Sequence, residues 1–294
     1  MSFNNQYWHL QRAGGEALIL KTTKSGTFSM TITTSSTVDV DWGDGNSDAG
    51  VSGVITHSYA DSSEKTISVT NDLDLITSFN CEFNNLNPID LSSLVSCTFF
   101  AIGSNSNLSE IINPTSSAII TTYNAASCNL NSLDVSGFSN LGGVFSVFGN
   151  SNLSSILFPA SSRDFSLLYA YSCNLASIDL SPLSGNVANL SLHSNSNLST
   201  ITLCADITNI LLYSCDLGVV DFSGTTYNSI RVENNNMTAA EVNETLVNLD
   251  TQGLTSKNLN ISGTNAAPDG TSGGFDGLTA KTNLQGKGWT VTTS

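Results

Sequence analysis

Apolar or small residues recur in this chain as pairs separated by a single residue, and the pairs return about every 22 residues. Alternation with a period of two is typical of a β-strand that buries one face. Three residues after each pair comes Asn or Cys, and two or three residues further on comes Leu or Met. The pairs are Phe79/Cys81, Phe100/Ile102, Tyr123/Ala125, Phe145/Val147, Leu168/Ala170, Leu190/Leu192, Ile210/Leu212 and Ile230/Val232. The pattern predicts a stack of short strands in which each copy covers the apolar side of the next.

The Asn and Cys positions are expected to form a ladder inside this stack. They are Asn84, Asn105, Cys128, Asn150, Cys173, Asn195, Cys215 and Asn235. An inward Asn amide can satisfy backbone groups that would otherwise be buried without partners, at a cost of about 1 to 3 kcal/mol each. The combined pattern, LxLxx(N/C)xL, resembles the signature of leucine-rich repeats. The resemblance implies a mainly β fold, a leucine-rich-repeat solenoid of about eight turns over residues 73–237.

Six cysteines occur in the chain, and three of them occupy ladder positions. Neighbouring Cys-bearing turns lie two rungs apart, about 10 Å at a strand spacing of about 4.8 Å, which is too far for a disulfide. Buried free thiols are therefore preferred, and a disulfide framework is the alternative.

The two ends of the chain depart from the repeat. Residues 1–15 are expected to form an N-terminal arm, and residues 16–72 predict a small β-sandwich because short alternating segments are typical of strands. Residues 238–294 predict an α/β capping repeat with helices, which would cover the open end of the stack. The predicted N-terminal strands are Ala17 to Leu20, Thr27 to Thr33, Thr37 to Trp42 and Thr66 to Thr70.

The C-terminal segment carries specific start signals. Thr238 and Glu241 form a capping-box pattern that predicts a helix up to about Asp250. The further expected elements are a strand around Leu259 to Ile261, a short helix near Leu278 to Leu284 and a final strand Trp289 to Val291.

Both ends also resemble known families. The segment Val-Asp-Val-Asp-Trp-Gly-Asp-Gly at 38–45, followed by His57-Ser-Tyr59, resembles the polycystic-kidney-disease-type (PKD) domain. The tail from Gly263 to Val291 looks like the ending of leucine-rich proteins from bacteria of the Bacteroidetes type and their phages. These resemblances imply a spacer or adhesion module ahead of the repeats, with no chemistry of its own.

Four acidic residues in the PKD-like segment allow two interpretations. Asp39, Asp41, Asp44 and Asp48 could hold calcium, since hard cations prefer clustered oxygens. Their spacing misses the EF-hand register by one residue, and two of them alternate with Val38 and Val40 on a predicted strand. A structural turn is therefore preferred, and a calcium site is the alternative.

One candidate binding surface emerges from the repeat. Side chains between and just after the apolar pairs are expected to face outward on the concave side. From the fourth copy onward they include rings on adjacent rungs, about 5 Å apart. The candidate residues are Phe148, Tyr171, His193 and Tyr213, with Tyr169 and Leu211 beside them and Arg231 beyond. A sugar or peptide chain could lie on such a strip. In the preferred alternative the rings only stack on each other and stiffen the sheet, at about 0.2 to 1 kcal/mol per pair.

Composition narrows the function classes. Only 11% of the residues are charged, and Ser, Thr and Asn replace them, which is typical of extracellular or particle-borne β proteins. A net charge of −15 argues against nucleic acid or anionic membrane as a partner. Neither a secretory leader nor a membrane span is recognised, so no membrane insertion is expected. No catalytic motif accompanies the three histidines, and neither a metal nor any other cofactor is expected.

The favoured hypothesis is a non-enzymatic, exposed phage virion component, such as a fibre, tail or capsid-decoration protein. Its expected partners are other virion proteins and a host-surface glycan or protein, and homo-oligomerisation is left open. The alternative is a bacterial cell-surface adhesin whose leader was removed. An enzyme acting on polysaccharide is a third hypothesis, which would need a paired-carboxylate cleft that the outward residues do not show.

Overall fold

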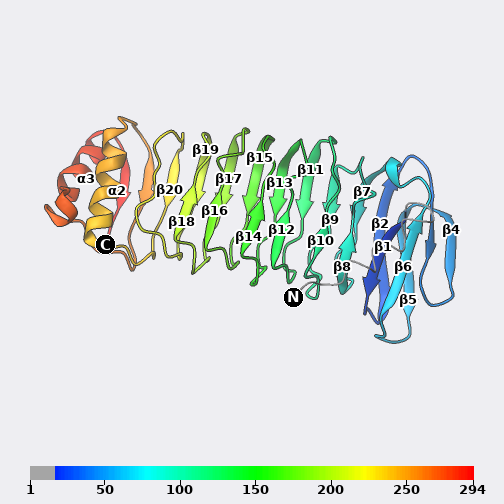
Figure 1. Cartoon of the computed structure of the whole chain (residues 1–294). Coiled ribbons are helices and arrows are strands. Elements are labelled where there is room, and N and C mark those ends of the chain that lie inside the picture. Colours follow the sequence, from blue (N-terminus) through cyan, green and yellow to red (C-terminus); the bar gives the residue numbers. More distant parts are fainter. Residues whose placement is uncertain (1–16) are drawn as a thin grey trace.

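The computed structural model describes residues 17–294 as one elongated stack (Figure 1). The expected N-terminal arm, residues 1–15, lies outside the described residues. The fold is mainly β and contains a β-solenoid of about seven turns. The sequence predicted about eight turns, because eight copies of the repeat can be counted.

The long wall of the solenoid is a sheet of twelve strands, ten of which run parallel. The parallel strands are β7 (Ile76–Asn80), β9 (Phe99–Ala101), β11 (Ile120–Asn124), β13 (Leu141–Ser146), β15 (Ser162–Tyr169), β17 (Val187–Ser191), β19 (Ile207–Leu211), β20 (Ser229–Arg231), β21 (Asn258–Asn260) and β22 (Thr290–Thr292). Their register aligns one inward residue of every strand, from Phe79 paired with Phe100 to Leu259 paired with Val291. These inward side chains belong to a single buried hydrophobic cluster that extends from Leu18 to Val291.

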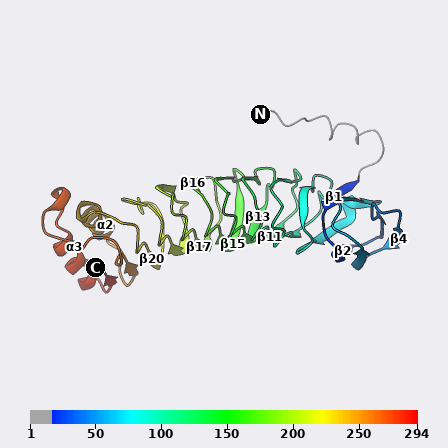
Figure 2. The same cartoon turned by 90° about the horizontal axis from the view of Figure 1, so that it is seen from below.

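Shorter strands line the opposite side of the coil (Figure 2). They are β8 (Leu86–Asp90), β10 (Ile111–Ile112), β12 (Ser132–Asp134), β14 (Ser155–Leu157), β16 (Ser177–Asp179) and β18 (Thr200–Thr202). β12 pairs with β14 and β16 with β18, so each of these four return strands is joined to only one neighbour by strand pairing.

The N-terminal segment contributes six strands, two more than the sequence predicted. They are β1 (Leu18–Thr22), β2 (Gly26–Thr34), β3 (Val38–Asp41), β4 (Ser47–Val51), β5 (Gly53–Tyr59) and β6 (Lys65–Thr70), followed by the 3-10 helix η1 (Leu73–Leu75). β2 pairs antiparallel with β7, and β1 pairs antiparallel with β8. The twelve-stranded sheet and the six-stranded sheet that contains β8 and β10 therefore both extend into the N-terminal segment.

The C-terminal segment places two helices at the other end of the stack (Figure 1). α2 (Ala239–Thr251) begins with the expected capping box between Thr238 and Glu241, and α3 (Gly277–Gly286) follows the 3-10 helix η2 (Ser272–Gly274). Asn243, buried in α2, donates to Asp269 Oδ1 at 2.8 Å and to the carbonyls of Ser272 and Phe275. Within residues 17–294 neither helix is long and apolar enough to cross a membrane.

The ladder residues all lie inside the solenoid, and each links its own turn to the preceding one. Asn150 is fully buried, accepts from the backbone N–H of Leu130 at 3.0 Å, and donates to the carbonyls of Ala125 and Val147 at 2.9 and 2.8 Å. Asn105 and Asn195, two turns away on either side, and Asn235, four turns further along the chain, repeat this arrangement. Asn84, at the start, instead exchanges hydrogen bonds with the backbone of Ser29 in β2.

Cysteine fills the same place in alternate turns. The thiols of Cys128, Cys173 and Cys215 donate to carbonyls of their own and the preceding turn at 3.5 to 3.7 Å. All six cysteines are buried and free, as the ladder spacing predicts. Burial raises the pKa of the three ladder thiols to about 11, so they remain neutral in the interior at physiological pH.

The sequence missed one ladder residue. Asn265 is buried, accepts from the N–H groups of Asn235 and Met237, and donates to the carbonyls of Val232 and Ile261. It stands 30 residues after Asn235, because α2 is inserted in this turn. The sequence did contain a signal for this ladder residue, namely the apolar pair Leu259 and Ile261, of which Ile261 lies four residues before Asn265.

Each turn bends sharply just before its ladder residue. The preceding residue has a positive φ in all eight copies, for example 55° at Ser127 and 71° at Gly149. This left-handed conformation is disfavoured for most side chains but accessible to Gly, Asn and, at some cost, Ser. Small or polar residues therefore occupy the position, with the exception of the exposed Phe83.

We expect Asn150→Ala to lower the free energy of unfolding by about 2 kcal/mol or more, because it leaves the N–H of Leu130 and the carbonyl of Ala125 buried without partners, and the Val147 carbonyl with only the weak Cys173 thiol donor. Denaturant unfolding followed by circular dichroism measures the change. The matched control is Asn152→Ala, which removes an exposed amide bonded to the side chain of Asn129 and should cost less than about 0.5 kcal/mol. Equal, small effects of the two substitutions would contradict the role of the ladder.

Candidate functional site

Four rings form one continuous column on the outer face of the twelve-stranded sheet. Phe148 stacks on Tyr171, Tyr171 on His193, and His193 on Tyr213, with centroid distances of 4.6, 4.5 and 4.3 Å. The interplanar angles are 4°, 15° and 6°, so the rings are nearly parallel. Each ring lies two residues before a ladder position, and the rung spacing therefore sets the stacking distance. We name these four residues the aromatic column.

The stacking decides what the column can offer to a ligand. Parallel rings about 4.5 Å apart cover each other's faces, so the ring edges and polar groups point outward instead. The sequence suggested a strip of rings on which a sugar or peptide chain could lie. Within the column that arrangement has no free ring faces, and stacking of a ligand is confined to the ends. All four rings are half-buried.

The neighbouring positions extend the column sideways. Tyr169, the last residue of β15, meets Tyr171 edge to face at a centroid distance of 5.8 Å. Leu211, the last residue of β19, is half-buried and lies between Ser191 and Arg231 in the strand register. These two side chains border the column without joining its stack.

Arg231 closes the C-terminal end of the column. Its guanidinium lies over the Tyr213 ring, 4.6 Å from the centroid. Its Nε donates to Glu233 Oε1 at 2.8 Å, and its Nη2 contacts the same oxygen. Glu233 is buried, and its Oε2 has no hydrogen-bond partner among residues 17–294. The sequence placed Arg231 beyond the rings, but its ion pair with Glu233 was not predicted.

Burial inside the stack shifts two titratable groups. Burial between the rings, and secondarily the charge of Arg231, lowers the pKa of His193 below its usual 6.5. Burial, with the neighbouring Tyr169 and Tyr213 hydroxyls, raises the pKa of Tyr171. His193 is therefore neutral at physiological pH, which suits an aromatic stacking partner.

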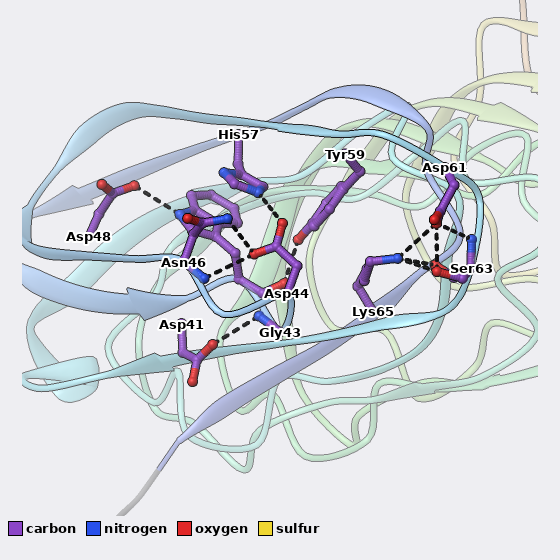
Figure 3. Close-up of polar contacts among 11 residues, drawn as sticks. Asp41, Gly43, Asp44, Asn46, Asp48, His57, Tyr59, Asp61, Ser63 and Lys65 are labelled. Atoms are coloured by element: carbon purple, nitrogen blue, oxygen red, sulfur yellow. Dashed lines mark hydrogen bonds and ion pairs between the residues drawn. The ribbon is translucent and has the colours of Figure 1, made fainter.

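The acidic cluster in the N-terminal segment is committed to its own backbone and side chains (Figure 3). Asp41 accepts from the N–H of Gly43 at 2.8 Å, and Asp39 accepts from the N–H of Gly50 at 2.8 Å. Asp44 contacts His57 Nε2 at 2.7 Å, and this bond holds the pKa of Asp44 below its usual value. Each of these carboxylates thus has a local structural partner.

Trp42 connects this turn to the core. Its indole N–H donates to Asp48 at 2.8 Å, and His57 stacks on its ring with centroids 4.8 Å apart. The hydroxyl of Tyr59 donates to the Trp42 carbonyl at 2.8 Å. These hydrogen bonds explain why Trp42, Asp44, His57 and Tyr59 stand at this spacing: together they hold a folded turn. In the part of the chain that the structure describes, no three His, Cys, Asp or Glu side chains are grouped to hold a metal ion.

No protein family, curated protein or solved structure matches this chain.

We expect the imidazole of His193 to titrate with a midpoint below pH 6.5, because the charged form is poorly solvated in the stack. Because the pKa of His193 is lower in the folded chain than in the unfolded chain, its contribution to the free energy of unfolding is fully present above pH 6.5. This contribution is lost as the pH falls through the folded pKa. An NMR titration of the His193 ring protons measures the midpoint. Arg231→Gln should raise it, whereas Arg163→Gln, at the start of β15, should leave it unchanged. A midpoint at or above 6.5 would contradict the assignment.

Proposed function

We propose that this chain is a non-enzymatic structural and recognition protein, an exposed component of a phage particle that binds a host-surface glycan or protein. The observation that carries the proposal is the aromatic column, which runs across four rungs on one outer face. Half-buried rings with outward edges, bordered by Tyr169 and Arg231, are the residue types enriched where proteins recognise partners. The Ser-, Thr- and Asn-rich composition, with only 11% charged residues, supports an extracellular setting.

The same stacking also stabilises the sheet. Each ring pair contributes about 0.2 to 1 kcal/mol, which is a sufficient reason for the rings to be present. Recognition adds to this role when the exposed edges and hydroxyls contact a ligand. A stiff column is a preorganised surface, because its rotamers are fixed before binding.

The architecture is proposed to be that of a leucine-rich repeat protein of the Bacteroidetes type. The inward Asn and Cys ladder with its period of about 22 residues supports this identity. We propose that β1 to β6 act as a PKD-like β-sandwich and that α2, α3, β21 and β22 act as the C-terminal cap. A solenoid needs covered ends, since an open turn would expose apolar surface and strand edges.

A bacterial cell-surface adhesin is the second candidate. The same composition and the same column suit a protein anchored on a cell as well as one carried by a particle. The genes that flank the coding sequence distinguish the two, because capsid or tail genes indicate a particle.

We expect mass spectrometry of purified phage particles, grown on the bacterium whose genome or phage carries this gene, to detect the chain. Antibody-gold electron microscopy should then label the outside of intact particles. Gold on uninfected cells, with none on particles, would favour the adhesin instead. Absence from both surfaces would overturn the proposed function.

Tyr171→Ala should reduce binding of the labelled protein to host cells by about tenfold, as expected for a central aromatic contact. Tyr171 is the ring with most neighbours, yet its loss should change the melting temperature little, since stacking pairs are individually weak. Phe83→Ala is the matched control, because Phe83 is an exposed aromatic outside the column. A lower melting temperature with unchanged cell binding would show that the rings serve stability alone.

A further inference from the structure

The two ends of the aromatic column differ. At the C-terminal end the Tyr213 ring is covered by the guanidinium of Arg231, which is paired with Glu233. At the other end Phe148 has one aromatic or cationic stacking partner among residues 17–294, namely Tyr171. One end of the stack is therefore closed by a planar cation, and the other is not.

Small residues adjoin the uncovered side of Phe148. In the two preceding turns, the equivalent position two residues before the ladder residue is Ala126 and Gly103, which are both buried. Ala126 extends outward by a single carbon, whereas the Phe148 ring extends several bonds further. The outer part of the ring face therefore projects beyond the side chain of the adjacent rung. The nearest neighbour of this ring face along the line of outward positions is thus a single methyl group, with the side chain of Asn124 beside it.

A carboxylate stands next to this space. Glu82 occupies the equivalent position one turn before Gly103 and is half-buried. Its Oε1 accepts from Asn124 Nδ2 at 2.8 Å, and a Cβ at Gly103 would lie 3.3 Å from this same oxygen. The carboxylate thus lies over the rung of Gly103. No cationic side chain among residues 17–294 forms an ion pair with Glu82.

We propose that this open end of the column, formed by Glu82, Gly103, Asn124, Ala126 and Phe148, binds an arginine side chain of a partner protein. The inference rests on the proposed recognition function and narrows its ligand to a protein that presents arginine. The guanidinium stacks on the free face of Phe148 over Ala126 and forms an ion pair with Glu82.

The chain itself contains a contact of this kind. Arg231 combines the same elements at the other end: a ring one rung away, a centroid distance of 4.6 Å and a carboxylate in the same column as the rings. At a rung spacing of about 4.8 Å, a guanidinium above Ala126 has the same relation to Phe148. Arginine suits the site better than lysine, since its planar group stacks and donates to a carboxylate at once.

Long-range electrostatics favour the same ligand. The chain carries a net charge of −15, which attracts a basic partner and increases its association rate. A sugar could stack on Phe148 as well, but a neutral ring would leave Glu82 without a counter-charge. A neutral sugar is therefore the competing ligand in the test.

The test titrates the full chain with the blocked peptide Gly-Arg-Gly and follows backbone amides by NMR. We expect saturable shifts around residues 101–103, 124–127 and 147–149, with a dissociation constant on the order of 1 mM, as befits one partly exposed cation–ring contact. Gly-Lys-Gly keeps the charge without the planar group, and the citrulline peptide keeps the planar group without the charge. Both should bind at least about fivefold more weakly.

Variants place the binding at the open end. Glu82→Gln should weaken the arginine peptide about fivefold, as expected for an exposed ion pair. The matched control is Glu110→Gln, which removes the same charge from an exposed position on a return segment. Asn124→Arg should abolish peptide binding, because its own guanidinium occupies the space beside Phe148, and circular dichroism checks that the variant remains folded.

Three results would overturn the inference. They are the absence of saturable shifts at these amides, equal binding of the lysine or citrulline peptide, and shifts produced by N-acetylglucosamine or galactose but not by the arginine peptide. Host binding that depends on Tyr171 but is unaffected by Asn124→Arg would leave the proposed function standing and remove the arginine site. Binding of the arginine peptide without any binding to host cells would keep the arginine site and remove the proposed function.

Discussion

The inward Asn or Cys of each turn is the contact on which the whole stack depends. Its side chain joins the backbone of one turn to that of the turn before, inside a core where unpaired backbone groups are costly. This bond fixes the register between turns. The outward side chains two residues before the ladder are therefore held in one line, from Glu82 through Phe148 to Glu233. The surface chemistry is thus a consequence of the internal ladder.

Much of the fold could be predicted from the sequence, because its signals are local and repeated. The inward pairs, the ladder residues and the capping box at Thr238 are each contained within a few residues. The missed features lack such signals. β4 buries none of its side chains, so it shows no apolar alternation, and Asn265 is separated from its repeat by the inserted helix α2. The continuation of both sheets into the N-terminal segment depends on contacts distant in sequence.

The candidate site was predictable in composition but not in orientation. The repeat places Phe148, Tyr171, His193 and Tyr213 on adjacent rungs, and the spacing alone implies that they are near each other. Whether such rings present their faces or their edges depends on the side-chain rotamers, which a sequence pattern does not determine. The parallel stack covers the inner ring faces, so the two ends of the column acquire a different chemistry from its middle.

The unbroken pairing from β5 to β22 has a mechanical consequence. In a coil built this way, the hydrogen bonds between strands lie along the long axis of the rod. A pull on the two ends loads every interface in series, and the shortest pairings, such as the three residue pairs joining β20 to β21, carry the same tension as the longest. The force that the rod withstands is therefore set by its weakest strand pairing, whatever the number of turns.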